Sequence, residues 1–189
     1  MQPTVIHTTD QIAGRATPVT DDNPLPVGGQ IGGFVARPSA TFTRPANTNQ
    51  YTSGDLVAND VAAGSVVPMS FAISRVTGAG GLLRRIWLRK TGAVLTNASF
   101  RVHLYSEAPA VTNGDNGAWL TNGAGAYVGS LDVVMDKAFT DGAGGNGVPA
   151  IGSDITFTAD TYYALIEARA AYTPASGEQF TLSLELLRN

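Results

Sequence analysis

The stretch Ala98-Ser99-Phe100-Arg101-Val102-His103-Leu104-Tyr105-Ser106 alternates apolar with polar or amphipathic side chains at every step. Because successive side chains of a β-strand point to opposite faces, this period of two predicts a strand with one buried face. The face predicted to point inward carries Ala98, Phe100, Val102 and Leu104, and the outward face carries Ser99, Arg101, His103 and Tyr105.

The same alternation recurs through most of the chain after residue 33. Further strands are predicted within residues 40–43, 65–74, 81–90, 127–135, 155–157, 162–169 and 180–186, with Val67 and Leu184 among their inward side chains. Glycine- and asparagine-rich connections separate them, notably residues 112–125 and 141–152. Since no segment combines a helical period with helix caps, we expect an all-β, antiparallel β-sandwich, a jelly roll of about eight strands.

Residues 1–33 differ from the rest of the chain. They show no sustained period, and Pro3, Pro18, Pro24 and Pro26 remove hydrogen-bond donors and favour extended backbone. We therefore predict an extended N-terminal arm over residues 1–33 and a sandwich domain over 34–189; an unstructured tail is the alternative. The arm's candidate partner-binding residues are Ile6, Leu25, Pro26 and Val27.

Composition narrows the classes of function. The 189 residues include no cysteine, which excludes disulfides, thiolate metal sites and thiol nucleophiles. Charged residues make up 14% of the chain, against about 25% in an average globular protein. The net charge is −3 and the ten arginines are scattered, so nucleic acid is not an expected partner. The start has no apolar signal segment and no run is long enough to span a bilayer, so synthesis in a cytoplasm and no membrane contact are expected.

Few side chains suited to catalysis are available. His7 and His103 are the chain's two histidines, and no Gly-x-Ser-x-Gly sequence supports a serine nucleophile. A lone histidine on the outward face of a strand, such as His103, is typical of a surface or an interface. Residues 142–147 match the pattern G-x-G-x-x-G, but Val-Pro-Ala-Ile-Gly follows instead of a helix. We therefore predict a flexible loop there and no dinucleotide site.

The carboxylates give no clear site either. Glu167 and Glu185 alternate with polar neighbours on predicted strands, which indicates solvated sheet faces. Asn113, Asp115 and Asn116 lie in a loop of a kind that binds calcium, but the EF-hand pattern is missing and Asx turns are the simpler interpretation. We expect no catalytic residue, no cofactor, no metal and no enzyme activity. With eleven Asp and four Glu, a glycosidase is the remaining enzymatic alternative.

A cluster of aromatic and cationic residues is the most informative surface feature. Residues 81–90 are predicted to place Leu82, Ile86 and Leu88 inward and Leu83, Arg85, Trp87 and Arg89 outward. If residues 91–97 form a hairpin, Trp87 lies near Arg101, and the outward patch comprises Arg85, Trp87, Arg89, Arg101, His103 and Tyr105. Arg and Trp are enriched at binding hot spots, so the patch indicates a subunit interface or a sugar-stacking surface. The alternative is that Trp87 packs under a neighbouring loop.

The segments 17–27 and 51–57, followed by a glycine- and asparagine-rich β body, resemble small structural proteins of tailed bacteriophages. In those proteins a proline-rich N-terminal stretch precedes a jelly-roll domain. The resemblance implies a capsid decoration (cement) protein on the outer surface of the virion, bound to the major capsid protein and homo-oligomeric, most often a trimer. No catalytic residues carry over. A carbohydrate- or receptor-binding module of a phage head fibre or tail is the alternative.

Overall fold

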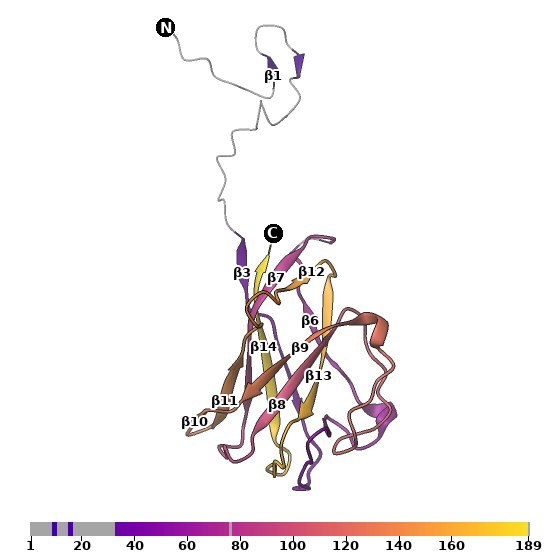
Figure 1. The fold of residues 1–189 in the computed structure, drawn as a ribbon, viewed down its shortest axis with the longest axis vertical. Helices are drawn as coiled ribbons and strands as arrows, with labels where there is room; N and C mark the ends of the chain where they lie inside the picture. Colours follow the sequence, from indigo (N-terminus) through magenta and orange to yellow (C-terminus); the bar gives the residue numbers. More distant parts are fainter. Residues whose placement is uncertain (1–8, 11–14, 17–32, 76, 189) are drawn as a thin grey trace. The chain divides into compact units, whose positions relative to one another are not determined.

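The structure is a computed structural model that describes residues 9–10, 15–16, 33–75 and 77–188. The chain divides into two units, Met1–Gly32 and Gly33–Asn189. In the first unit, β1 (Thr9–Asp10) pairs antiparallel with β2 (Arg15–Ala16). The second unit holds the remaining described strands, and we call it the body (Figure 1).

The body is a β-sandwich of two antiparallel sheets, one of seven strands and one of five. The first sheet consists of β3 (Phe34–Ala36), β4 (Ser39–Thr43), β7 (Gly81–Lys90), β10 (Lys137–Phe139), β11 (Gly142–Gly147), β12 (Ile155–Phe157) and β14 (Gln179–Arg188). The second sheet consists of β5 (Leu56–Val57), β6 (Met69–Ala72), β8 (Ser99–Tyr105), β9 (Tyr127–Val134) and β13 (Thr161–Ala168). The helical turns of the described residues are the 3-10 segments η1 (Ala63–Ser65) and η2 (Ala124–Ala126).

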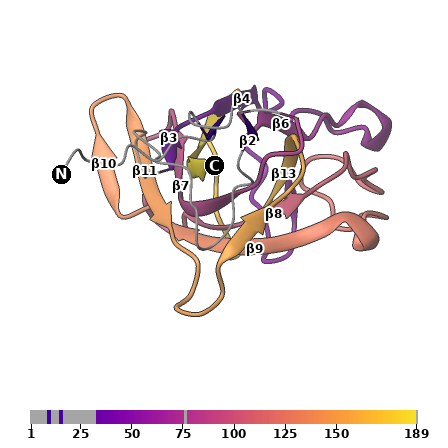
Figure 2. The ribbon, with the colours of Figure 1, turned by 90° about the horizontal axis from the view of Figure 1, so that it is seen from above.

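The order of the strands is that of a jelly roll, as the sequence predicts. In three places two short strands follow one another along the same edge of a longer strand. β3 and β4 both pair with β14, β11 and β12 with β7, and β5 and β6 with β13. The first sheet then runs β3/β4, β14, β7, β11/β12, and the second runs β5/β6, β13, β8, β9. β10 adds a hairpin strand beyond β11. Figures 1 and 2 show the sheets from the side and from above.

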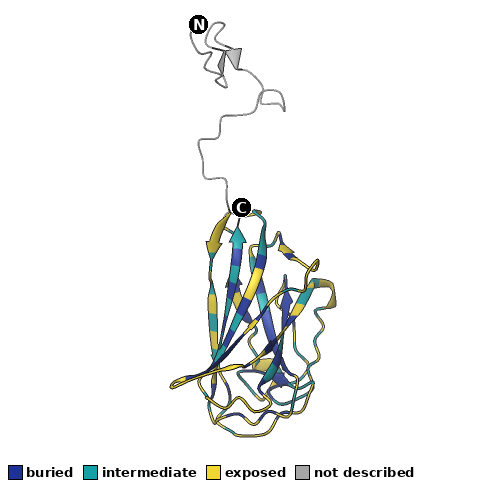
Figure 3. Ribbon diagram, turned by 60° about the vertical axis from the view of Figure 1, so that its left-hand side comes forward, coloured by how far each residue is buried: buried dark blue, intermediate teal, exposed yellow. Residues whose placement is uncertain are grey.

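The core lies between the sheets and is built from alternating side chains of their inner faces (Figure 3). Phe100, Val102 and Leu104 of β8 are fully buried, as predicted, and so is Leu184 of β14. At the centre, the Phe100 ring packs edge-on against Phe180 at 5.3 Å and Tyr172 at 5.4 Å between ring centroids. Such aromatic pairs stabilise a core beyond the area that they bury.

Two side chains, Leu83 and Val67, do not lie on the side of the sheet predicted for them, each for a local reason. Met69, Phe71 and Ile73 of one predicted strand and Ile86 and Leu88 of the other are buried as predicted. On β7, Arg85 pairs with Glu185 and Leu83 with Leu186, so Arg84 is an extra, bulged residue. The bulge shifts the alternation, and Leu83, predicted outward, is 1% exposed in the core. In the other case the strand begins later than predicted, at Met69, and Val67, predicted inward, is 68% exposed.

The predicted flexible loop at residues 142–147 is also wrong, because this segment is strand β11. Its glycines permit close backbone approach to the second sheet: a Cβ on Gly145 would lie 2.0 Å from the carbonyl oxygen of Val134 at the end of β9. A Cβ on Gly147 would lie 3.0 Å from the carbonyl oxygen of Asp132. The glycines therefore let the two sheets approach each other here.

The central core residues provide a test of the sandwich. We expect Phe100→Ala and Leu184→Ala each to lower the free energy of unfolding by about 2–5 kcal/mol, because both side chains are fully buried. The measurement is urea denaturation, with the exposed Val67→Ala as the control, expected to change stability by less than about 0.5 kcal/mol. Equal, small effects of all three substitutions would contradict the packing described.

Candidate functional site

The predicted aromatic and cationic patch is divided between the two sheets. No hairpin joins β7 to β8: β7 lies between β14 and β11 in the first sheet, whereas β8 lies between β13 and β9 in the second. Arg85, Trp87 and Arg89 therefore share the outer face of the first sheet, and Tyr105 belongs to the second. The predicted partner-binding residues of the arm, Ile6, Leu25, Pro26 and Val27, lie outside the described residues.

The half of the patch on the second sheet is mostly covered. Tyr105, predicted to bind a partner, is 1% exposed beneath the connection 106–126. The ring of Trp119, from the same connection, stacks on His103 with 3.9 Å between centroids and 14° between planes. His103 Nε2 lies 2.8 Å from Glu167 Oε2. Glu167 was predicted to lie on a solvated face of the sheet, but it is buried. Tyr105 also belongs to a second, smaller hydrophobic cluster with Leu56, Ala58 and Leu165, and Trp119 packs against this cluster.

The half on the first sheet borders an open hollow of about 400 Å³. Trp87 stands in the middle of a row across three strands, since it pairs with Asn146 of β11 on one side and Ser183 of β14 on the other. We call this concavity the Trp87 hollow; it is lined by Arg37, Arg85, Trp87, Asn146, Ser183, Leu184 and Glu185. Arg85 and Trp87 were predicted as binding residues, whereas Arg37, Asn146 and Ser183 were not.

Trp87 is held in place by its neighbours. Its six-membered ring lies over Gly144, where a Cβ would come within 2.5 Å of the indole. Phe139 of β10 packs against it at 6.5 Å between centroids with 66° between planes. Trp87 therefore rests on the glycine strand and is half-buried, not hidden under a loop. An aromatic side chain fixed in this way loses little conformational entropy on binding a ligand.

The charges in the Trp87 hollow converge on one oxygen. Glu185 Oε2 accepts hydrogen bonds from Arg85 Nε at 3.1 Å and Nη2 at 2.9 Å, and from Arg37 Nε at 3.0 Å. The Arg85 guanidinium, with help from Arg37, holds the pKa of Glu185 below its usual value, so Glu185 stays ionised. Two guanidinium groups thus face one carboxylate, which leaves one positive charge in excess.

Several polar groups of the Trp87 hollow remain free for a ligand. Among the described residues, Glu185 Oε1, the Asn146 amide and the Ser183 hydroxyl make no hydrogen bond. Together with the remaining N–H groups of Arg37 and Arg85 they offer donors and acceptors next to an aromatic ring. This combination suits binding of a polar ligand and includes no nucleophile paired with a base.

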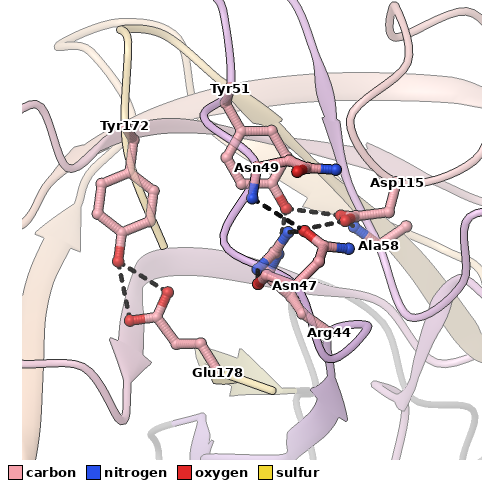
Figure 4. A network of polar contacts seen from close by, with 8 residues as sticks. All are labelled: Arg44, Asn47, Asn49, Tyr51, Ala58, Asp115, Tyr172 and Glu178. Atoms are coloured by element: carbon pink, nitrogen blue, oxygen red, sulfur yellow. Dashed lines mark hydrogen bonds and ion pairs between the residues drawn. The ribbon is translucent and has the colours of Figure 1, made fainter. Parts of the chain in front are cut away.

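Two polar networks are buried where connections between the strands meet. Figure 4 shows the first network and the Tyr172–Glu178 pair of the second. In the first, Asp115 Oδ1 accepts hydrogen bonds from Tyr51 Oη at 2.6 Å and from the Ala58 N–H at 2.9 Å. Asp115 Oδ2 pairs with Arg44 Nη2 at 2.8 Å, and both side chains are fully buried. Burial, reinforced by Asp115, raises the pKa of Tyr51, so its hydroxyl stays protonated as a donor. Asp115 is thus occupied by protein groups, not placed to hold calcium.

The second network joins Lys90, Tyr172 and Glu178. The Tyr172 hydroxyl donates to Glu178 at 2.7 Å, and Lys90 Nζ lies 3.3 Å from Glu178 Oε1. Burial lowers the pKa of Lys90, while Glu178 opposes that shift. The sequence did not predict either network, because Arg44 and Asp115 are 71 residues apart and no local pattern links them. Because both networks are buried and each links a connection to another part of the chain, their hydrogen bonds fix those connections in place.

Comparisons with known proteins do not assign the chain to a family. No protein-family model matches it, and a search of curated proteins finds no match. Among the described residues, no group of three or more His, Cys, Asp or Glu is placed to hold a metal ion. No helix in the same part of the chain is long and apolar enough to cross a membrane.

The first buried network gives a stability prediction. Asp115→Ala should lower the free energy of unfolding by about 3–5 kcal/mol, because it leaves the buried Arg44 guanidinium without a counterion. Asp141→Ala is the control: Asp141 pairs with Arg89 at the surface, where such a pair contributes about 1 kcal/mol or less. Urea denaturation measures both, and a cost for Asp115→Ala no larger than the control's would contradict this role.

His103 gives a prediction for pH. Burial lowers the pKa of His103 below its usual value; Glu167 opposes this, and Arg101 and Arg169 add to it. The unfolded chain therefore binds a proton at this residue more readily than the folded chain, and stability should fall as the pH falls below about 6.5. Unfolding free energies at about pH 7.5 and about pH 5.5 should differ more in the wild type than in His103→Gln. The same loss in both proteins would contradict the direction of the shift.

Proposed function

We propose that this chain is a non-catalytic virion structural protein that decorates a phage capsid, binding the major capsid protein on the outer surface as a homo-oligomer. The observation that carries the proposal is the low charge of the body's surface: charged residues make up 14% of the chain, and five of them, Arg44, Lys90, Asp115, Glu167 and Glu178, are buried. Interface centres are depleted of charged residues, so a surface of this kind suits coverage by neighbouring proteins.

Pairing reduces the effective charge of that surface further. Arg37 and Arg85 pair with Glu185, Arg89 with Asp141, and Arg101 with Asp132. Large apolar side chains are exposed on the same body; they include Val61, Val67, Val134, Val148 and Ile151. Exposed apolar groups without strong charge favour protein–protein contact, and closed cyclic oligomers are the usual result for identical chains.

The buried titratable groups also favour a structural role. Glu178 with Tyr172 and Asp115 with Tyr51 bring ionisable groups to within 3 Å, the closeness that acid–base chemistry needs. All of these side chains are enclosed, however, so a substrate does not reach them. This supports a function in binding, without catalysis.

The arm provides the test. Deleting residues 1–32 should leave the body folded, because the chain divides into two units after Gly32 and the strands of both sheets of the sandwich belong to the second unit. Binding to capsids should nevertheless fall at least about tenfold, since an extended peptide with Ile6, Leu25 and Val27 can add main-chain hydrogen bonds and fill grooves on a partner. Its prolines reduce the entropy lost on ordering.

Co-sedimentation with undecorated capsids measures that binding, beside a thermal melt of the truncated protein. The melting temperature should change by less than about 4 °C, the shift that roughly 1 kcal/mol produces in a domain of this size. Absence of the full-length protein from regular positions in cryo-electron density of particles would refute the decoration role. Unchanged binding after truncation would place the contact on the body.

A second candidate is a carbohydrate- or receptor-binding module of a head fibre or tail. The specific observation that favours it is the Trp87 hollow, which combines a fixed aromatic ring with free polar groups.

A further inference from the structure

We infer that the Trp87 hollow binds an acidic saccharide, with the sugar ring against Trp87 and its carboxylate on Arg37 and Arg85. This inference goes beyond the decoration role and does not depend on it. The volume of about 400 Å³ is within the usual range for small-molecule sites, roughly 300–1,000 Å³.

The Trp87 ring favours a sugar as the ligand of the hollow. Gly144 and Phe139 fix the Trp87 indole in a half-buried position beside the hollow. The C–H faces of a pyranose pack on such a ring, and its hydroxyls need partners that both donate and accept hydrogen bonds. Asn146 and Ser183 provide such partners on either side of Trp87, at the same register of the sheet.

The charge favours a sugar that carries a carboxylate. Arg37 and Arg85 both bond to Glu185 Oε2 through Nε and Nη2, so their Nη1 groups remain for a ligand. Guanidinium groups bind carboxylates with short, charge-assisted hydrogen bonds. Glu185 also orients both arginines before a ligand arrives, which lowers the entropy cost of binding. The one excess positive charge would be neutralised by one carboxylate.

The other half of the sequence-predicted patch does not provide this chemistry. The outer face of the second sheet also has a smaller hollow, lined by Tyr105, Trp119, Leu120, Thr121, Ala124 and Tyr127. Its lining contains no arginine, lysine or histidine, so it has no positive charge to attract an acidic ligand.

The experiment uses the isolated full-length protein, so its outcome is separate from any result with capsids. A glycan array with uronate- and sialate-bearing oligosaccharides and their neutral counterparts identifies the strongest ligand. Calorimetry then compares that ligand with its carboxyl-reduced form, and with a poly-glutamate peptide as a carboxylate without a sugar. We expect the acidic glycan to bind at least about tenfold more tightly than either comparison.

Three variants locate the site. Trp87→Ala and Arg85→Gln should each weaken binding of the acidic glycan at least about tenfold. Arg101→Gln is the matched control, because Arg101 also pairs with a carboxylate on an outer sheet face, but on the second sheet, and it should leave binding unchanged. Thermal melts confirm that each variant is folded, and Arg85→Gln alters a partly exposed side chain that the core does not need.

Four results would overturn the inference. They are no acidic glycan bound on the array, equal binding of the carboxyl-reduced form, equal binding of poly-glutamate, and undiminished binding by folded Arg85→Gln.

Discussion

Strand β11 consists mostly of glycine, and the packing of the two sheets along this strand depends on the missing side chains. Because Gly145 and Gly147 have no Cβ, the backbone of the first sheet approaches the carbonyl oxygens of Val134 and Asp132 in the second. The sandwich is thereby closed along this side by main chain rather than by a layer of side chains. On the opposite face of the same strand, Gly144 gives Trp87 a surface to lie on, so one glycine-rich segment shapes both the core and the Trp87 hollow.

The buried polar residues stabilise a different part of the body, where connections rather than strands are buried. The connections between strands carry polar groups. Where a connection is buried, water no longer solvates these groups, and a polar group left without a hydrogen-bond partner lowers the stability of the fold. Arg44, Tyr51 and Asp115 pair these groups across distant parts of the chain, and Lys90, Tyr172 and Glu178 do the same beside them. The rings of Tyr51 and Tyr172 stack 6.4 Å apart, which joins the two networks.

The sequence predicts those features that follow from local alternation. Residues 98–104 and 180–186 show a clean period of two, and their inward faces are buried as expected. It does not predict features that depend on a partner strand. The bulge at Arg84 arises from pairing with β14, and nothing in residues 81–90 marks it. The glycines of β11 resemble a loop because their reason for being glycine, the nearby β9 backbone, is distant in sequence.

The same limit explains why the sequence predicts only two of the seven residues that line the Trp87 hollow. Arg85 and Trp87 alternate on one strand and were recognisable, whereas Arg37, Asn146 and Ser183 reach the hollow from three other segments. The jelly roll sends the chain from β7 to the opposite sheet, so the neighbours of Trp87 come from β11 and β14 and not from the next strand along. The connection 106–126 then covers part of the second sheet's outer face, over Tyr105 and His103. The two outer faces are therefore unequal: the first sheet presents a fixed indole beside polar groups that no other protein group bonds, whereas the second has buried most of its equivalent residues.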